Sequence, residues 1–373
     1  MSFARTDTST LGKWWWTVDR WTITAVTLLI AIGALLTLAA SPAVAERIGT
    51  SPFHFVRRQF AFLPPALLTI FLVSLLNARN VRRVAVLGFL GSVAMMALVL
   101  VAGVEIKGAT RWISLAGLQI QPSEFCKPTF AVVSAWMFSL RRDTDGIPGH
   151  IVAVMLYLMV AALLMAQPDF GMTVVISVVW GAQFFLAGLP LALVVICVVV
   201  GLCGMVGAYF TFPHVASRID RFLDPASGDS YQVATALQAF RDGGLLGRGP
   251  GEGRVKAVLP DAHTDFIMAV AGEEFGLLLC LLVVALFAFV VLRGLSRMLQ
   301  EENLFVLLAT SGLLVQFGLQ AVVNMASTLH LMPTKGMTLP FISYGGSSVM
   351  ALALGMGMVL ALTRRRSDDG GLS

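Results

Sequence analysis

Long apolar runs are the feature that most constrains how this chain of 373 residues can fold. Residues 189–212, for example, form a run of 24 residues without a single charged side chain. A helix that crosses the hydrocarbon core of a membrane needs roughly 20 such residues. Only 13% of the residues are charged, against about 25% in an ordinary soluble domain, and the mean hydropathy is +0.83. The sequence therefore excludes a soluble globular fold and predicts an all-α polytopic membrane protein.

Ten apolar segments divide the chain, which predicts ten transmembrane helices in a single membrane domain over residues 1–373. The segments lie at about 22–40, 60–76, 84–104, 128–140, 151–167, 172–187, 189–212, 266–292, 304–327 and 347–363. The polar remainder comprises an N-terminal segment, 1–20, a large loop, 213–265, and a C-terminal tail, 364–373. Within the loop, apolar residues at helical spacing from Val233 to Phe240 predict a short helix that ends at Gly243.

The distribution of Lys and Arg predicts the orientation in the membrane. Thirteen of the 26 basic residues lie in segments on the same side as the N-terminus, seven lie in short segments on the other side, and six lie in loop 213–265. Short cytoplasmic segments carry the excess of positive charge, whereas long loops are discounted. We therefore expect both termini to be cytoplasmic and the large loop, between helices 7 and 8, to be periplasmic. Because the basic residues form no continuous stripe, nucleic acid is not expected as a partner.

Three outward-facing segments are rich in polar residues although the protein is mostly apolar. They are residues 107–127, the loop that ends at Asp265, and residues 332–348. An ionisable group at the edge of a membrane segment indicates function because its burial is otherwise unfavourable. If the predicted orientation holds, all three segments converge on one periplasmic face.

Asp265 is the main candidate catalytic residue, since it lies where the large loop meets the apolar run 266–292. A carboxylate at this position is suited to act as a general base on a membrane-linked substrate. The alternative is a structural role as the N-cap or first-turn residue of a helix. His263, two residues earlier, either tunes Asp265 or stabilises the loop.

Lys127 is the main candidate for binding an anionic substrate group, together with Arg111 or Lys335. It precedes Pro128 at the head of an apolar run, where a cation is unfavourable unless it is paired. Two structural alternatives remain: Lys127 extends to the interface as a snorkelling side chain, or it forms an ion pair with Glu124.

Several other polar residues admit two interpretations. Glu273 and Glu274 lie within the apolar run after Asp265 and have either a structural role or a place in a substrate cavity. Asp169 is either a turn residue or a partner for a basic group. Gln320 and Asn324 are one helical turn apart in segment 304–327, and we expect them to form hydrogen bonds between helices.

The three polar segments carry motifs that resemble those of the SEDS family (shape, elongation, division and sporulation), and the resemblance extends over the whole chain. The motifs read KGATRWISLAGLQIQPSEFCK at 107–127, LPDAHTDFIMAVAGEEFG at 259–276 and MPTKGMTLPFISYGGSS at 332–348. The Pro-Thr-Lys-Gly at 333–336 is more similar to the cell-division branch than to the elongation branch. The resemblance implies ten transmembrane helices and a peptidoglycan glycosyltransferase that polymerises lipid II.

The resemblance also implies roles for particular residues. Asp265 matches the catalytic aspartate of the family, Trp112 the tryptophan of the first motif, and Lys127 its essential basic residue. The candidate substrate-binding residues are Lys127, Trp112, Arg111, Lys335, His263 and Ser343. Two positions depart from the division branch, which often has Arg where this chain has Gln119 and Glu where it has Ala257 and Val258.

The chemistry of glycan polymerisation agrees with these motifs. The 4-hydroxyl of one disaccharide attacks the anomeric carbon of another, and a lipid diphosphate leaves, which requires a base for the hydroxyl and positive charge near the diphosphate. We expect inversion at the anomeric carbon. A divalent cation, Mg²⁺ or Mn²⁺, held between Asp265 and the diphosphate is compatible with this scheme, although no ligand cluster in the sequence requires it.

The resemblance further implies a bacterial inner-membrane protein at the division septum. The implied partners are a class B penicillin-binding protein (an FtsI-like transpeptidase), other division proteins and membrane lipid. A lipid II transporter and a non-catalytic division scaffold are the alternatives. A transporter needs polar groups along a path to the inner face, whereas the connection at 187–190 is short and uncharged.

Overall fold

The computed structural model describes residues 9–47, 49–106, 109–115, 118–143, 148–188, 190–223, 231–333 and 336–364. Most of these residues are helical. The helices are α1 (Thr10–Thr17), α2 (Arg20–Arg47), α3 (His54–Ser74), α4 (Ala78–Ala102), α5 (Pro122–Asp143), α6 (Gly149–Ala166), α7 (Phe170–Leu186), α8 (Leu191–Thr211), α9 (Pro213–Leu223), α10 (Tyr231–Gly243), α11 (Val255–Val258), α12 (Ile267–Met298), α13 (Leu304–Thr328) and α14 (Gly346–Leu362).

Each of the ten predicted apolar segments overlaps one helix, namely α2 to α8 and α12 to α14. Within the described ranges, seven helices are long and apolar enough to cross a membrane: α2, α3, α4, α6, α8, α12 and α13. The apolar helices α7 and α14 are shorter, with 17 residues each. Helix α5 carries Glu124 and Lys127 in its first turns, so it is the least apolar of the ten.

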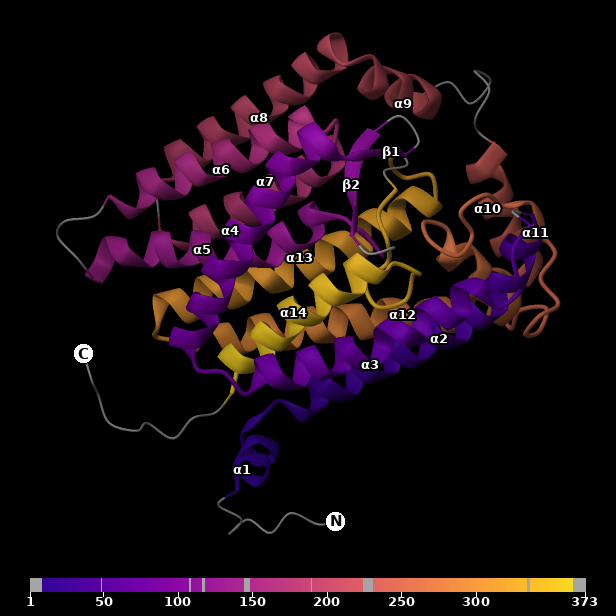
Figure 1. The fold of residues 1–373 in the computed structure, drawn as a ribbon, viewed down its shortest axis with the longest axis horizontal. Helices are drawn as coiled ribbons and strands as arrows, with labels where there is room; N and C mark the ends of the chain where they lie inside the picture. The colour runs from indigo at the N-terminus through magenta and orange to yellow at the C-terminus, as the bar shows by residue number, and fades with distance from the viewer. Residues whose placement is uncertain are drawn as a thin grey trace.

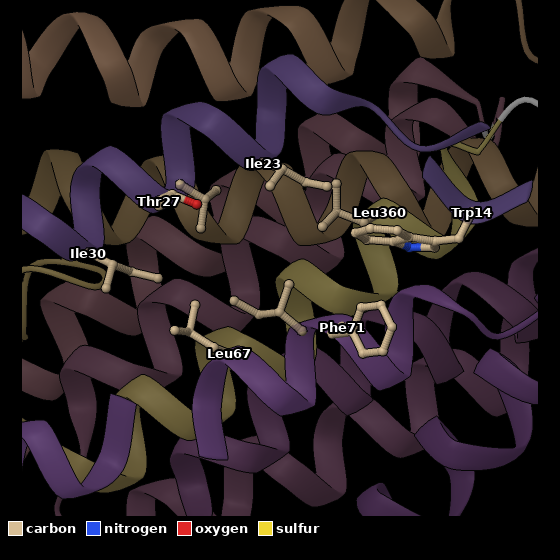
Figure 2. Close-up of a pocket in the computed structure, with 9 residues that line it drawn as sticks. Trp14, Ile23, Thr27, Ile30, Leu67, Phe71 and Leu360 are labelled. Atoms are coloured by element: carbon tan, nitrogen blue, oxygen red, sulfur yellow. The ribbon is translucent and has the colours of Figure 1, made fainter. Parts of the chain in front are cut away.

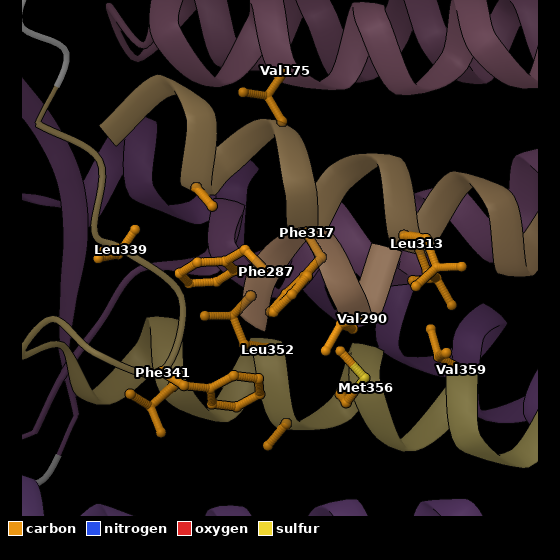
Figure 3. Close-up of a cluster of buried hydrophobic side chains, with 14 of the residues drawn as sticks. Val175, Phe287, Val290, Leu313, Phe317, Leu339, Phe341, Leu352, Met356 and Val359 are labelled. Carbon is orange, nitrogen blue, oxygen red and sulfur yellow. The ribbon is translucent and has the colours of Figure 1, made fainter. Parts of the chain in front are cut away.

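The long helices pack side by side, and α13 lies at the centre of the bundle, in contact with α5, α7, α12 and α14 (Figure 1). Aromatic and aliphatic side chains fill the space between α12, α13, α14 and the segment that precedes α14 (Figure 3). Phe287, Phe317 and Phe341 form a chain of ring contacts there, with centroids 5.3 and 6.1 Å apart. Helix α8, by contrast, lies at the edge of the bundle with most of its apolar side chains exposed, as expected for a surface that faces lipid.

A small antiparallel sheet corrects the expectation of a purely helical fold. It has the order β1 (Val104–Ile106), β2 (Ala109–Leu115) and β3 (Leu118–Ile120). Val104 is paired with Trp112, and Ile113 with Ile120. The first polar segment is therefore partly extended, and the three strands satisfy one another's backbone groups between α4 and α5.

The loop predicted at 213–265 contains α9, α10 and α11. Helix α10 confirms the short helix expected there, and it buries Val233, Ala236 and Ala239. It packs against α12, so the loop is held to the bundle rather than standing away from it. Residues 224–230 of the loop are outside the described ranges.

Helix α12 is broken at Gly276, where φ is 75° and ψ is −176°. A helix break leaves backbone groups without their usual partners. The loop after α10 supplies new ones: Arg248 N and Gly249 N donate to the carbonyls of Glu273 and Glu274, while Leu277 N and Leu278 N donate to the carbonyls of Gly244 and Leu245. The loop and the first part of α12 thus form one hydrogen-bonded unit.

Substitution of Gly276 by Ala is expected to destabilise the protein. Backbone strain alone usually costs about 1–3 kcal/mol, and steric overlap of the new Cβ adds to it. Its backbone conformation is accessible to glycine only, and a Cβ there would lie 2.4 Å from Gly247 N and from Leu245 O. Thermal unfolding in detergent should show a clear fall in the apparent melting temperature. Gly201→Ala on α8 is the matched control, because a Cβ at Gly201 meets no atom within 4 Å. Equal melting of the two variants would contradict this account of the break.

An ionic cluster joins α1, α2, α12 and α14 at the end of the bundle remote from the sheet (Figure 1). Asp19 Oδ2 accepts a hydrogen bond from Arg293 Nε (2.8 Å), and Asp19 Oδ1 accepts one from Arg293 Nη2 (3.1 Å) and lies 3.3 Å from Arg297 Nη2. Burial acts to raise the pKa of Asp19, but the hydrogen bonds and the two guanidinium charges outweigh it and hold the pKa below the ordinary value. Arg364 donates to Thr17 Oγ1 at 3.0 Å. The start of α2 and the end of α14 therefore lie at the same end of the bundle.

A small apolar cavity of about 120 Å³ lies at this same end, between α2 and α3 (Figure 2). Its lining is almost entirely hydrophobic, apart from the Thr27 hydroxyl and the Trp14 indole. The lining residues are Trp14, Ile23, Val26, Thr27, Ile30, Leu67, Ile70, Phe71 and Leu360. The cavity has no ionisable groups and is therefore unsuited to catalysis. Asp265 lies at the opposite end of the bundle, before α12.

Candidate functional site

Asp265 lies one residue before Phe266, the N-cap of α12, and its side chain is half-buried. It is therefore neither the N-cap nor a first-turn residue of α12, which were the structural alternatives. Its backbone carbonyl accepts hydrogen bonds from Asn324 Nδ2 (3.0 Å) and Thr328 Oγ1 (3.4 Å) on α13. A Cβ built on Gly336 would lie 3.5 Å from Asp265 Oδ2, so the third polar segment passes directly beside this carboxylate.

Hydrogen bonds join the Asp265 loop to the segment before α14. Ser343 Oγ donates to the carbonyl of Thr264 at 2.5 Å and accepts from Leu339 N at 2.8 Å. Tyr344 N donates to the carbonyl of His263 at 3.0 Å. The Ser343 hydroxyl is buried and engaged in both bonds, so this structure gives Ser343 the role of holding the two segments together.

His263 lies in an aromatic cluster next to this junction. Its ring centroid is 4.2 Å from that of Phe55 and 5.5 Å from that of Tyr344. Burial raises the pKa of the Tyr344 phenol, although a hydrogen bond with Arg58 acts in the opposite direction. Of the two interpretations of His263, these contacts favour stabilisation of the loop.

Lys127 is buried in the second turn of α5, where only 3% of its surface is exposed. Its Nζ lies 3.0 Å from Glu124 Oε2 and donates to Gln320 Oε1 at 2.9 Å. The ion pair with Glu124, one of the expected alternatives, is thus confirmed. The Gln320 amide in turn donates to the carbonyl of Thr338 at 3.1 Å. Lys127 is therefore connected to the same segment that passes beside Asp265.

Arg111 is held at the turn between α6 and α7. Its guanidinium donates to the carbonyls of Gln167 (3.2 Å) and Pro168, and Nη1 lies 3.5 Å from Asp169 Oδ1. Burial raises the pKa of Asp169, against the opposing charge of Arg111. Asp169 also caps α7 by accepting from Met172 N at 3.3 Å. It is thus both a turn residue and a partner for a basic group, and the guanidinium of Arg111 is occupied by this turn.

Two candidate residues remain, Trp112 and Lys335. Trp112 lies on β2, half-buried opposite Val104. Lys335 lies outside the described residues, although its neighbour Gly336 adjoins Asp265.

Glu273 and Glu274 have structural partners in the large loop. Glu273 Oε1 accepts from Arg254 N (2.7 Å) and Val255 N (3.0 Å). Glu274 accepts from Gly251 N at 2.9 Å, and its Oε1 lies 2.5 Å from Lys256 Nζ. Both carboxylates are almost fully buried. Of their two interpretations, the structure favours the one in which they fasten the loop to α12.

The departures from the division-branch motifs fall on exposed positions. Gln119 is exposed on β3, where its backbone pairs with Ser114. Ala257 and Val258 are exposed on α11. Within the described part of the chain, no three His, Cys, Asp or Glu side chains cluster to bind a metal ion. A divalent cation at Asp265 would therefore depend on the phosphates of a substrate for further ligands.

The fold and the site together define a helical membrane protein with a half-buried carboxylate before α12 and a buried lysine that is connected to it through α13 and the segment before α14. The family model described as "Cell cycle protein", which covers FtsW, RodA and SpoVE, matches residues 19–368. The chain belongs to this family, the SEDS proteins.

Relatives and solved structures match over nearly the whole chain. A protein of Caulobacter vibrioides, named probable peptidoglycan glycosyltransferase FtsW, is 46% identical over 373 residues, which are 100% of this chain and 96% of the relative. The protein of that name from Escherichia coli O6:H1 is 33% identical and covers 90% of this chain, with 83% of its own length matched. The fold is similar to that of RodA from Thermus thermophilus, with 28% identity, a TM-score of 0.68 and coverage of 94% and 97%. A chain from a study of polymerization and crosslinking by a peptidoglycan synthase complex matches with 27% identity, a TM-score of 0.74 and coverage of 93% and 97%.

Proposed function

We propose that this protein is a peptidoglycan glycosyltransferase of the cell-division type, which polymerises lipid II into glycan strands and releases undecaprenyl diphosphate. Relatives that match 90% to 100% of this chain are named probable peptidoglycan glycosyltransferase FtsW, which supports both the activity and the division branch. The single observation that carries the mechanism is the position of Asp265, half-buried before α12 and beside the backbone of Gly336. Hydrogen bonds from Asn324 and Thr328 to its backbone carbonyl attach this residue to α13.

Asp265 is the general base in this proposal. It removes the proton from the 4-hydroxyl of the acceptor sugar as that oxygen attacks the anomeric carbon of the donor. The bond from the anomeric carbon to the lipid diphosphate breaks, and the configuration inverts because no covalent enzyme intermediate forms. The negative charge that develops on the diphosphate is stabilised by Lys127, with Lys335 as a second cation next to Gly336. Trp112 contacts the substrate in this proposal.

The proposed function requires that the site face the periplasm, where glycan strands are built. We infer ten membrane-spanning helices, α2 to α8 and α12 to α14, with both termini in the cytoplasm and the large loop outside. The excess of Lys and Arg on the side of the termini supports this orientation. The protein then lies in the bacterial inner membrane, at the division septum.

A class B penicillin-binding protein of the FtsI type is the proposed partner, since it would cross-link the strands. A solved structure similar to this chain comes from a synthase complex that couples polymerization and crosslinking. Other division proteins and membrane lipid complete the proposed surroundings. A divalent cation between Asp265 and the diphosphate would add positive charge where the leaving group forms.

Polymerisation by purified protein tests this function. The protein, with its transpeptidase partner, is incubated with lipid II, and the products are separated by size. We expect glycan strands longer than the disaccharide unit. Movement of lipid II across vesicle membranes without polymerisation would instead indicate a transporter, and neither activity would indicate a scaffold.

A further inference from the structure

Helix α13 carries two buried amide side chains, Gln320 and Asn324, at a spacing of four residues. This spacing puts them on one face of the helix, about 6 Å apart along its axis. Each is almost fully buried. Buried amides need hydrogen-bond partners, and the partners of these two connect them to both halves of the proposed site.

The Asn324 amide joins two separate segments of the chain. Its Nδ2 donates to the carbonyl of Asp265 at 3.0 Å and to the carbonyl of Met337 at 2.6 Å. Because both partners are acceptors, the amide must present its NH₂ group to them, and the flipped orientation would oppose oxygen to oxygen. Asn324 therefore ties the loop of the proposed base to the segment before α14.

The Gln320 amide makes the corresponding connection for Lys127. Its Oε1 accepts from Lys127 Nζ at 2.9 Å, and its Nε2 donates to the carbonyl of Thr338 at 3.1 Å. Met337 and Thr338 are consecutive, so consecutive carbonyls of one segment bind amides one turn apart on α13. Asp265 and Lys127 are thus both connected to α13 and to the segment at 337–338.

We propose that Asn324 and Gln320 are positioning residues that fix the separation between Asp265 and Lys127, and hence between the acceptor hydroxyl and the departing diphosphate. The inference rests on the proposed function and deepens it. Neither amide needs to touch substrate. Both act through the groups that they hold, and a displacement of about 1 Å in such a site can reduce the rate about 100-fold.

Asn324→Ala tests the proposal, with lipid II polymerisation and amide hydrogen exchange measured on the full-length protein. We expect kcat to fall about 10- to 100-fold with KM for lipid II changed less than about threefold, because geometry and not binding is lost. Exchange should rise in residues 259–266 and 336–343 and stay unchanged in α4 and α6. Thr328→Val keeps the shape and removes the hydroxyl that lies 3.4 Å from the Asp265 carbonyl and 2.9 Å from the backbone carbonyl of Asn324, and it should lower kcat by a smaller factor.

Gln316→Ala is the matched control, since Gln316 is a buried amide on the same face of α13, two turns from Asn324. It should retain kcat within about twofold. A kcat for Asn324→Ala within twofold of wild type would overturn the proposal, as would a fall in kcat accompanied by increased exchange throughout the bundle. Failure of the proposed function is distinguishable, because the local exchange response does not depend on whether Asp265 is the base.

Discussion

Asp265→Asn is expected to reduce lipid II polymerisation by at least about 100-fold while the protein remains folded. An amide cannot accept the proton of the attacking hydroxyl, and a positioned general base contributes about 10²–10⁴-fold to a rate. The substitution keeps the size of the side chain. The hydrogen bonds from Asn324 and Thr328 go to the backbone carbonyl, so they remain available in the variant.

Initial rates of strand formation and thermal unfolding in detergent check this expectation together. Asp261→Asn is the matched control, since Asp261 is an acid of the same loop four residues earlier. Its φ of 54° is in the left-handed region, which Asn adopts readily. The control should polymerise lipid II at close to the wild-type rate. Normal glycan strand formation by Asp265→Asn would remove Asp265 from the mechanism.

Much of the helical architecture could be predicted from the sequence, because each membrane segment must satisfy its backbone internally. That requirement places helices wherever apolar runs are long, and all ten runs coincide with helices. The apolar run 128–140 is too short to span a membrane alone, so an extension back through Lys127 and Glu124 was also predictable. Helix α5 begins at Pro122, and these two side chains form an ion pair inside the bundle.

The features that escaped prediction depend on contacts between distant segments. The break at Gly276 requires the loop at 244–249 to provide hydrogen bonds, and a lone glycine in an apolar run does not reveal such a partner. Arg111 was predicted to bind an anionic substrate group, but its contacts with the turn at 167–169, more than fifty residues away, could not be predicted from the sequence. Local chemistry therefore identified the candidate groups, whereas the contacts that hold these groups come from distant segments of the chain.

Asp265 and Lys127 could be selected from the sequence for the same physical reason. A charge near hydrocarbon is unfavourable without a partner or a function. The structure adds what that rule could not specify, namely that Gln320 and Asn324 connect the two groups through Met337 and Thr338. Hydrogen bonding of these two amides was expected, but their partners lie mainly in a loop rather than on neighbouring helices.

Lys127→Met is expected to lose polymerisation and to destabilise the protein by about 3–5 kcal/mol, the usual cost of leaving one member of a buried ion pair uncompensated. Glu124 is 5% exposed and would lose the ammonium group that lies 3.0 Å from its carboxylate. Thermal unfolding should show a lower melting temperature. Loss of activity in this single variant alone does not separate binding of the diphosphate from maintenance of the fold.

The double variant Glu124→Gln with Lys127→Met separates the two roles. It removes both charges at similar volume, and replacement of a buried ion pair by uncharged residues is often neutral for stability. We therefore expect the melting temperature to return close to that of wild type while polymerisation stays at least about 100-fold reduced, because the Lys127 cation no longer stabilises the leaving diphosphate. Glu124→Gln alone, which keeps Lys127 and its bond to Gln320, is the control and should retain more activity than the double variant. Recovery of polymerisation along with stability in the double variant would show that Lys127 serves the fold and that another cation stabilises the diphosphate.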